Sequence, residues 1–190
     1  MKAELLILGV LHRGDFHPYE IKRRLTNAMV ECFTDVDVGT LYYAIRQLAA
    51  KKLIVAVSRQ RVSPGGTRTV YRITPKGRER FQELLNEQFA AAGSVPDTLY
   101  TAMLFLHLAD LSRATQFIRE KLERQSLLIA ETKALKTQLK PMLSTGGRYL
   151  LDHIELQRRL DQRWLRALLT DLEAGKVEDV PDPRKLGQSS

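Results

Sequence analysis

The chain has 190 residues, of which 44% are hydrophobic, and a formal net charge of +8. This composition suits a soluble globular protein with one large core or two small ones. The single cysteine, Cys32, excludes an internal disulfide framework, no Cys/His spacing matches a zinc site, and no apolar run approaches the roughly 18 residues of a membrane span. We therefore expect a cytoplasmic protein without metal or membrane contact.

Two helices are predicted before residue 30. The first runs from about Lys2 to Arg13 and ends at Gly14, a residue type that commonly follows a helix. The second begins at His17 and Pro18, since a proline is tolerated in a first turn, where its missing N–H has no helical partner. Each helix carries apolar residues at helical spacing, so each is expected to bury one face.

A third helix is predicted in the stretch VDVGTLYYAIRQLAAKKLI, residues 36–54, with Asp35 or Asp37 as its cap. One buried stripe is predicted at Leu41, Ile45 and Leu48. An ordinary solvated face carries Glu and Lys, whereas the side chains left here can hydrogen-bond phosphates and base edges. They are Tyr42, Tyr43, Arg46 and Gln47.

After residue 54 the apolar period changes from helical to alternating. The segments IVAVSRQ and RTVYRIT are rich in β-branched residues, and RVSPGG between them carries turn residues, which predicts a β-hairpin with a basic tip. Thr74 and Pro75 then give a cap and a first-turn proline for another helix. Three helices, a hairpin and a helix form a winged helix-turn-helix, whose recognition helix enters the DNA major groove.

We expect this first domain to span residues 1–92, because AAAGSVPD, residues 90–97, has the small residues, glycine and proline of a hinge. A second, helical domain is predicted over residues 97–174. Its helices are placed at 98–107, from Ser112 to about Lys140, and at 148–174 after the turn STGG. The tail, residues 175–190, has little apolar content and is expected to be disordered.

The two long helices of the second domain carry more apolar surface than one pair can cover internally. A partner chain would supply the rest, so a homodimerisation domain is predicted. The dimer contacts are assigned to Leu128, Leu135, Leu160, Trp164 and Leu168. Trp164 is also a candidate for stacking on a small aromatic or hydrophobic effector, with packing at the interface as the alternative.

The positive charge is concentrated in the first half of the chain. Residues 1–90 hold 15 Lys/Arg against 9 Asp/Glu, and residues 91–190 hold 15 against 13. Between residues 39 and 80, ten basic residues accompany one acid, Glu79. Such an asymmetry indicates a polyanion-binding surface, with a merely solvated basic surface as the alternative.

Three motifs, HPYEIKRRL, GTLYYAIRQLAAKKLI and GGTRTVYRITPKGRERF, occur in order over the first 90 residues and are followed by a long helical half. In these motifs the chain resembles the PadR family of bacterial transcriptional regulators, in its longer, AphA-like subfamily. The resemblance implies a homodimer that binds an inverted-repeat operator, usually as a repressor, and that a small molecule often releases. The chain departs from the family pattern at Pro18, Tyr43 and Ala49, and the tyrosine, which replaces a proline, alters the expected base preference.

Candidate DNA contacts lie on the third predicted helix and on the β-hairpin, which is the wing of the winged helix. Tyr42 and Arg46 lie one turn apart, so both can face the groove, although packing of the tyrosine and a phosphate-only contact of the arginine are the alternatives. Thr40 can bond a phosphate or simply cap the helix. The full set is Thr40, Tyr42, Tyr43, Arg46, Arg59, Arg61, Thr67 and Arg68.

No phosphate-binding loop, dinucleotide fingerprint, nucleophile elbow or metal cluster is present in the sequence, so we expect neither an enzyme nor a bound cofactor. The predicted function is sequence-specific binding of double-stranded DNA by a homodimeric transcriptional repressor that an effector releases. One alternative is an activator or co-regulator that acts through protein contacts. The other is a ligand-binding adaptor that has lost DNA binding.

Overall fold

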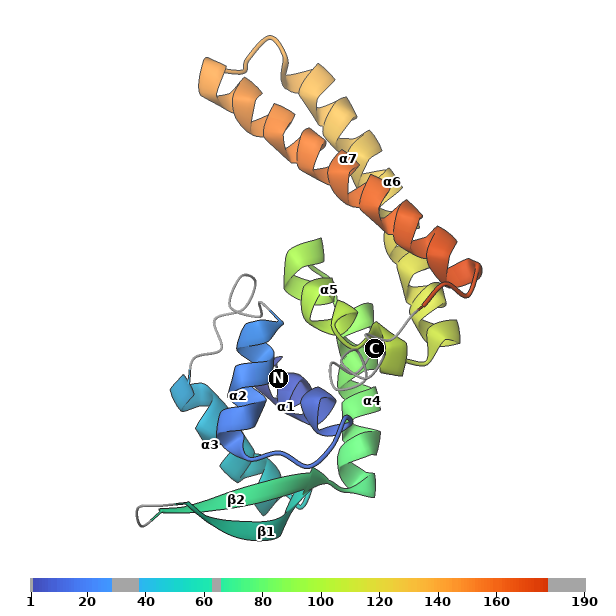
Figure 1. Cartoon of the computed structure of the whole chain (residues 1–190). Coiled ribbons are helices and arrows are strands. Elements are labelled where there is room, and N and C mark those ends of the chain that lie inside the picture. The colour runs from blue at the N-terminus through green and yellow to red at the C-terminus, as the bar shows by residue number, and fades with distance from the viewer. Residues whose placement is uncertain (1, 29–37, 63–65, 178–190) are drawn as a thin grey trace, which may run out of the picture. The chain divides into compact units, whose positions relative to one another are not determined.

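The computed structural model describes residues 2–28, 38–62 and 66–177, which form two compact units, Met1–Ala109 and Asp110–Ser190 (Figure 1). The elements in chain order are α1 (Lys2–Leu11), α2 (Pro18–Asn27), α3 (Val38–Ala50), β1 (Ile54–Val62), β2 (Gly66–Ile73), α4 (Pro75–Ala90), α5 (Val95–Met103), the 3₁₀ helix η2 (Leu106–Leu108), α6 (Leu111–Leu139) and α7 (Thr145–Glu173). This order confirms the predicted fold class, mainly helical with one hairpin. The caps predicted at Asp35 and Asp37 and most of the predicted tail lie outside the described residues.

Helix α1 lies at the centre of the first unit, against α2, α3, α4 and β2. Its side chains are buried on every side, whereas the sequence predicted one buried face: Leu5, Leu6, Ile7 and Leu8 are at most 1% exposed. Gly9 permits a close neighbour, because a Cβ there would lie 2.3 Å from the Phe105 ring. An apolar helix covered all round in this way is typical of a central core element.

Two predicted helix starts are confirmed by their caps. His17 Nδ1 accepts a hydrogen bond from the Glu20 N–H at 3.1 Å, and Thr74 Oγ1 accepts one from the Gly77 N–H at 3.0 Å. The Thr74 hydroxyl also lies 3.0 Å from the carbonyl oxygen of Leu53. A Cβ on Gly77 would lie 2.0 Å from that same oxygen, so only glycine allows this close approach of α4 to the start of β1.

Two other helices begin earlier than predicted. Ser94 caps α5 by accepting from the Asp97 N–H at 3.3 Å, so residues 95–97, the end of the segment predicted as a hinge, form the first turn of a helix. Helix α5 and the residues after it bury Leu99 and Phe105, and the first unit therefore extends to Ala109 instead of ending near residue 92. Ser144 caps α7 in the same way, and the glycines of STGG lie inside the helix.

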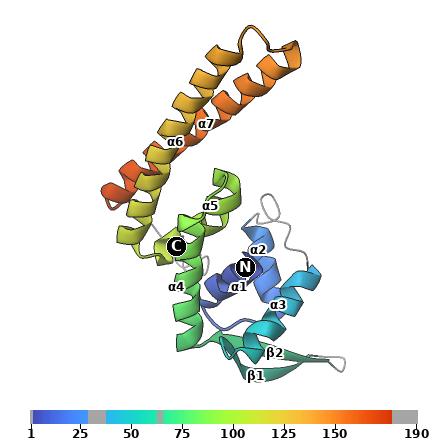
Figure 2. The same ribbon diagram turned by 180° about the vertical axis from the view of Figure 1, so that it is seen from behind.

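The second unit is a pair of long helices, α6 and α7, that lie side by side (Figures 1 and 2). Polar contacts join them: Arg158 donates to the carbonyl oxygen of Leu128 at 2.6 Å, and Arg119 pairs with Glu173 at 2.7 Å. Few of their side chains are buried, namely Ala114, Ile118, Ile129, Thr132, Leu165 and Leu172. None of the described helices has the length and low charge that a membrane span requires.

Candidate nucleic-acid interface

Helix α3 presents the face that the sequence predicted. Leu41, Ile45 and Leu48 are each 2% exposed, which confirms the buried stripe. Tyr42 is 41% and Tyr43 59% exposed, and Arg46 and Gln47 are also exposed. The apolar stripe anchors the helix on its own unit, so hydrogen-bonding groups remain on the outer face.

The end of α3 is fixed by an unusual residue. Lys52 has a φ of 60°, in the left-handed region that favours glycine. The N–H of Leu53 donates to the carbonyl oxygen of Leu48 at 2.9 Å, as expected where a helix ends with a left-handed residue. The left-handed turn stops the helix abruptly and leads the chain directly into β1.

Strands β1 and β2 form the antiparallel wing. Arg59 pairs with Thr69, Gln60 with Arg68, and Arg61 with Thr67, with a register shift between Ala56 and Ser58. The predicted wing contacts Arg59, Arg61, Thr67 and Arg68 therefore all lie in the part of the hairpin near its tip. The Arg68 side chain is exposed, and residues 63–65 at the tip lie outside the described part of the chain.

The basic residues of this unit differ in whether an acid neutralises them. Arg72 pairs with Asp15 at 2.5 Å, and Arg80 contacts Glu83 and Glu87 at 2.9 and 3.0 Å. The hydrogen bond from Arg72 lowers the pKa of Asp15, and the hydrogen bond to Glu83 raises the pKa of Arg80. Among the described side chains, Arg46 and Arg68 have no ion-pair partner.

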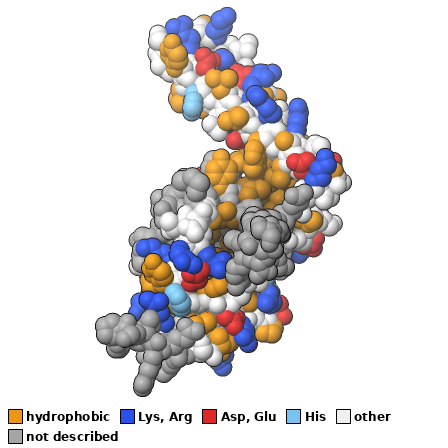
Figure 3. All heavy atoms as spheres, viewed as in Figure 1, with side chains coloured by type: hydrophobic (Ala, Val, Ile, Leu, Met, Phe, Trp, Pro, Cys, Tyr) orange, Lys and Arg blue, Asp and Glu red, His pale blue; other side chains and the backbone are white. Residues whose placement is uncertain are grey.

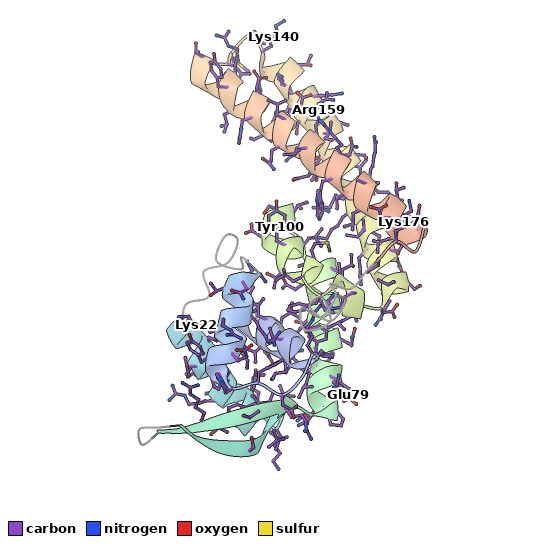
Figure 4. All side chains as sticks on the ribbon, in the orientation of Figure 1. Lys22, Glu79, Tyr100, Lys140, Arg159 and Lys176 are labelled. Carbon is purple, nitrogen blue, oxygen red and sulfur yellow. The ribbon has the colours of Figure 1, made fainter. Side chains whose placement is uncertain are left out.

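Sequence reasoning missed these ion pairs because their partners are distant in the chain or outside the counted segment. Asp15 and Arg72 are 57 residues apart, and no local pattern joins them. The apparent excess of ten bases over one acid is therefore smaller in the folded unit. Lys and Arg side chains nonetheless gather on the side that carries α2 (Figure 3), and Lys22 projects from that helix (Figure 4).

The predicted dimer contacts are unevenly exposed on α6 and α7. Leu135 and Leu160 are 44% and 54% exposed, whereas Leu128, Trp164 and Leu168 are half-buried. Other apolar side chains of these helices are more exposed and were not assigned: Leu127, Tyr149, Leu150 and Leu156. Their helical spacing could have revealed a second apolar stripe. No group of three metal-binding side chains occurs among the described residues.

The element order, the exposed face of α3 and the adjoining wing define a winged-helix protein of the DNA-binding class. The model of the transcriptional regulator PadR-like family matches residues 7–83. Uncharacterized protein X of Lysinibacillus sphaericus is 34% identical over 82 residues, which cover 43% of this chain and 73% of that protein. The chain belongs to the PadR-like family of transcriptional regulators.

Solved structures with a similar fold include Bacillus subtilis PadR in complex with operator DNA, with 17% identity, 89% and 98% of the two chains covered, and a TM-score of 0.43. The same protein in complex with p-coumaric acid gives 14% identity, 91% and 99% coverage, and a TM-score of 0.38. The virulence activator AphA of Vibrio cholerae gives 20% identity, 90% and 98% coverage, and a TM-score of 0.38.

Proposed function

We propose that the chain is a sequence-specific repressor that binds an inverted-repeat operator as a homodimer. The exposed face of α3 carries this proposal, because an arginine without an acidic partner stands there beside two tyrosines. Arg46 can donate two hydrogen bonds to guanine in the major groove, and Tyr42, one turn away, can reach the same groove. Tyr43 and Thr40 would bond the flanking bases or phosphates.

The wing would bind the DNA backbone. Long cationic side chains reach phosphates without strict placement, and Arg68 is exposed near the tip. The positions of Arg59, Arg61 and Thr67 along the strands put them in the same part of the hairpin. In this division of labour α3 selects the sequence and the wing supplies affinity that falls with salt.

The second unit would hold two copies together. On α7, Tyr149, Leu156 and Leu160 share one stripe at spacings of seven and four residues and are between 54% and 74% exposed. A second copy of the same helix pair offers the same stripe, and mutual burial removes both from water. A dimer would set its two recognition helices about one DNA turn apart, roughly 34 Å.

An effector would act on this dimer. Bacillus subtilis PadR has been solved in complex with p-coumaric acid, and Trp164, half-buried on α7, offers a ring on which an aromatic acid of that kind can stack. A ligand that binds more tightly to a dimer with one separation of its recognition helices than to a dimer with another changes the affinity for DNA. DNA in turn changes the affinity for the ligand by the same coupling free energy.

A DNA titration tests the proposal. The probes are a labelled duplex taken from immediately upstream of the protein's own gene and a random duplex of equal length, at two salt concentrations. Selective, salt-dependent binding by a dimer is expected, and a reconstituted promoter assay should show repression by the protein alone. Failure to bind either duplex at low salt, or activation of the promoter, would contradict it.

Two variants separate the roles of helix and wing. Arg46→Ala should reduce the binding free energy for the upstream duplex by about 1–3 kcal/mol and relax base preference. Arg68→Ala should weaken binding to both duplexes and reduce the slope of log affinity against log salt concentration by about 1. Lys133→Ala, an exposed change on α6, serves as the control. Equal losses of both variants on both duplexes would refute the division.

The dimer has its own test. Leu156→Ser should shift the monomer–dimer equilibrium toward the monomer. The dimerisation free energy should weaken by about 1.5–3 kcal/mol for each leucine buried, as measured by sedimentation equilibrium. Arg166→Ser truncates another exposed side chain on the same helix and should leave the equilibrium unchanged. A monomeric wild-type chain, or equal effects of the two variants, would contradict the proposed interface.

A further inference from the structure

The loop between α1 and α2 reaches across to the wing. Arg72 Nε on β2 donates to both carboxylate oxygens of Asp15 at 3.0 Å, and its Nη2 donates to Oδ2 at 2.5 Å. Next to this fork, the backbones of Phe16 and Tyr71 exchange two hydrogen bonds, at 3.1 and 3.0 Å. The loop thus pairs with β2, the strand that also carries Arg68.

The same loop is held to α2 on its other side. The guanidinium of Arg24 lies 4.1 Å from the centre of the Phe16 ring, and Arg24 Nε pairs with Glu20 at 3.1 Å. Gly14, which precedes the contact residues, has a φ of 152°, a conformation that side chains rarely allow. A continuous set of contacts therefore runs from α2 through Phe16 to the wing.

This connection matters because a two-stranded hairpin has little stability of its own in water. A hairpin that moved freely against α3 would have to be ordered when DNA binds, which reduces affinity. A bidentate arginine–carboxylate pair fixes direction as well as distance. Arg72 is therefore placed to orient the strand and is already engaged before a phosphate arrives.

We propose that Asp15 is a positioning residue for DNA binding, which holds the wing at a fixed angle to α2 through Arg72. The inference rests on the proposed function, since the wing has a binding role only if the chain binds DNA. It makes Asp15 an acid that favours the binding of a polyanion, although its own charge repels phosphate.

The sign of one substitution decides between positioning and simple repulsion. Removing an acid from a DNA-binding unit strengthens binding when only its charge matters. Asp15→Asn should instead weaken binding to the upstream duplex roughly three- to tenfold, the range expected when a charge-assisted hydrogen bond is lost. Arg72→Lys keeps the charge but not the fork, so it should weaken binding similarly.

The experiment measures the DNA affinity by titration and the amide hydrogen exchange rates, both on the full chain. Glu79→Gln removes the same charge from an exposed acid on α4 and is the matched control (Figure 4), with unchanged or slightly tighter binding expected. In Asp15→Asn the amides of Phe16 and Tyr71 should exchange faster in the free protein, while those of α1 keep their rates. Loss of affinity without loss of the α1 protection separates wing positioning from general destabilisation.

Three results would overturn the inference: equal or tighter binding by Asp15→Asn, unaltered exchange at both amides, or full affinity in Arg72→Lys. A wild-type chain that binds neither duplex would instead refute the proposed function. Hydrogen exchange would then still decide whether Asp15 holds the wing, because that measurement needs no DNA.

Discussion

The two units of the chain use apolar and charged residues in opposite ways. In the first, α1 and its neighbours bury leucine, isoleucine and phenylalanine almost completely, and unpaired basic groups remain outside. In the second, charged and amide groups connect α6 with α7, and leucines remain exposed. The first unit thus resembles a complete folding unit whose surface suits a polyanion, whereas the described helices of the second leave apolar side chains exposed.

This difference shows why helices with similar amphipathic patterns bury their apolar residues to different extents in the two units. Burial of apolar area is the main favourable term in folding, so a unit that leaves such area exposed gains stability from whatever later covers it. The first unit gains its stability within one chain. The second should gain part of its stability from a second copy, as the proposed dimer requires.

A large-to-small pair of substitutions tests this difference most strongly. Phe81 is fully buried, 4.3 Å from the His12 ring centre and 5.6 Å from that of Phe105. Phe81→Ala should lower the free energy of unfolding by about 3–5 kcal/mol at any protein concentration. Leu160→Ala, at a residue of the proposed dimer stripe that is 54% exposed, should have an effect that grows with protein concentration. Urea unfolding of both variants at two protein concentrations checks this, and an equal dependence on protein concentration in the two variants would remove the contrast.

Glycine-to-alanine changes should have opposite signs in the two units. Gly77→Ala places a Cβ 2.0 Å from a backbone oxygen and should lower the free energy of unfolding by about 1–3 kcal/mol. Gly146→Ala, in the first turn of α7, meets nothing closer than 4.0 Å and should raise it by about 0.4–1 kcal/mol. Thermal unfolding of both variants measures the signs, and stabilisation by Gly77→Ala would contradict the close junction.

The smallest effect concerns pH. Burial, together with the nearby Arg78 and His107, lowers the pKa of His12 below its ordinary value of 6.5. As pH falls through 6.5 the unfolded chain takes up this proton first, so the free energy of unfolding should fall between about pH 7 and pH 5. His12→Gln should flatten that slope in urea titrations carried out across this pH range. An unaltered slope in His12→Gln would exclude this origin.

Local chemistry made much of the fold predictable. The proline-bearing starts of α2 and α4, the turn residues of the hairpin and the stripe of α3 each follow from a few neighbouring residues. The starts of α5 and α7 were misplaced because Gly-Ser-Val-Pro and Ser-Thr-Gly-Gly fit either a linker or a cap with its first turn. The burial of α1 on all sides depends on elements that are distant in sequence.

Part of the candidate interface was predictable, because that part too depends on residues that are neighbours in the sequence. The exposed tyrosines and arginine of α3 follow from helical spacing, which a sequence shows directly. The contact of Asp15 with Arg72 depends on how the wing folds back on the loop, which no local spacing reveals. Charge counted along the chain therefore overestimated the free positive charge of the folded unit.

The ion pairs that join α6 and α7 make the second unit sensitive to ionic strength, as the proposed DNA contacts of the first unit would be. Arg119 with Glu173 lies near one end of the helix pair, and Lys136 with Asp152 lies toward the other. These side chains are about half exposed, so dissolved ions partly screen their attraction, over a Debye length of about 8 Å at physiological salt. In the proposed function the same ions weaken contacts with phosphates, so a rise in salt concentration would weaken both the attraction between the two helices and the binding to DNA.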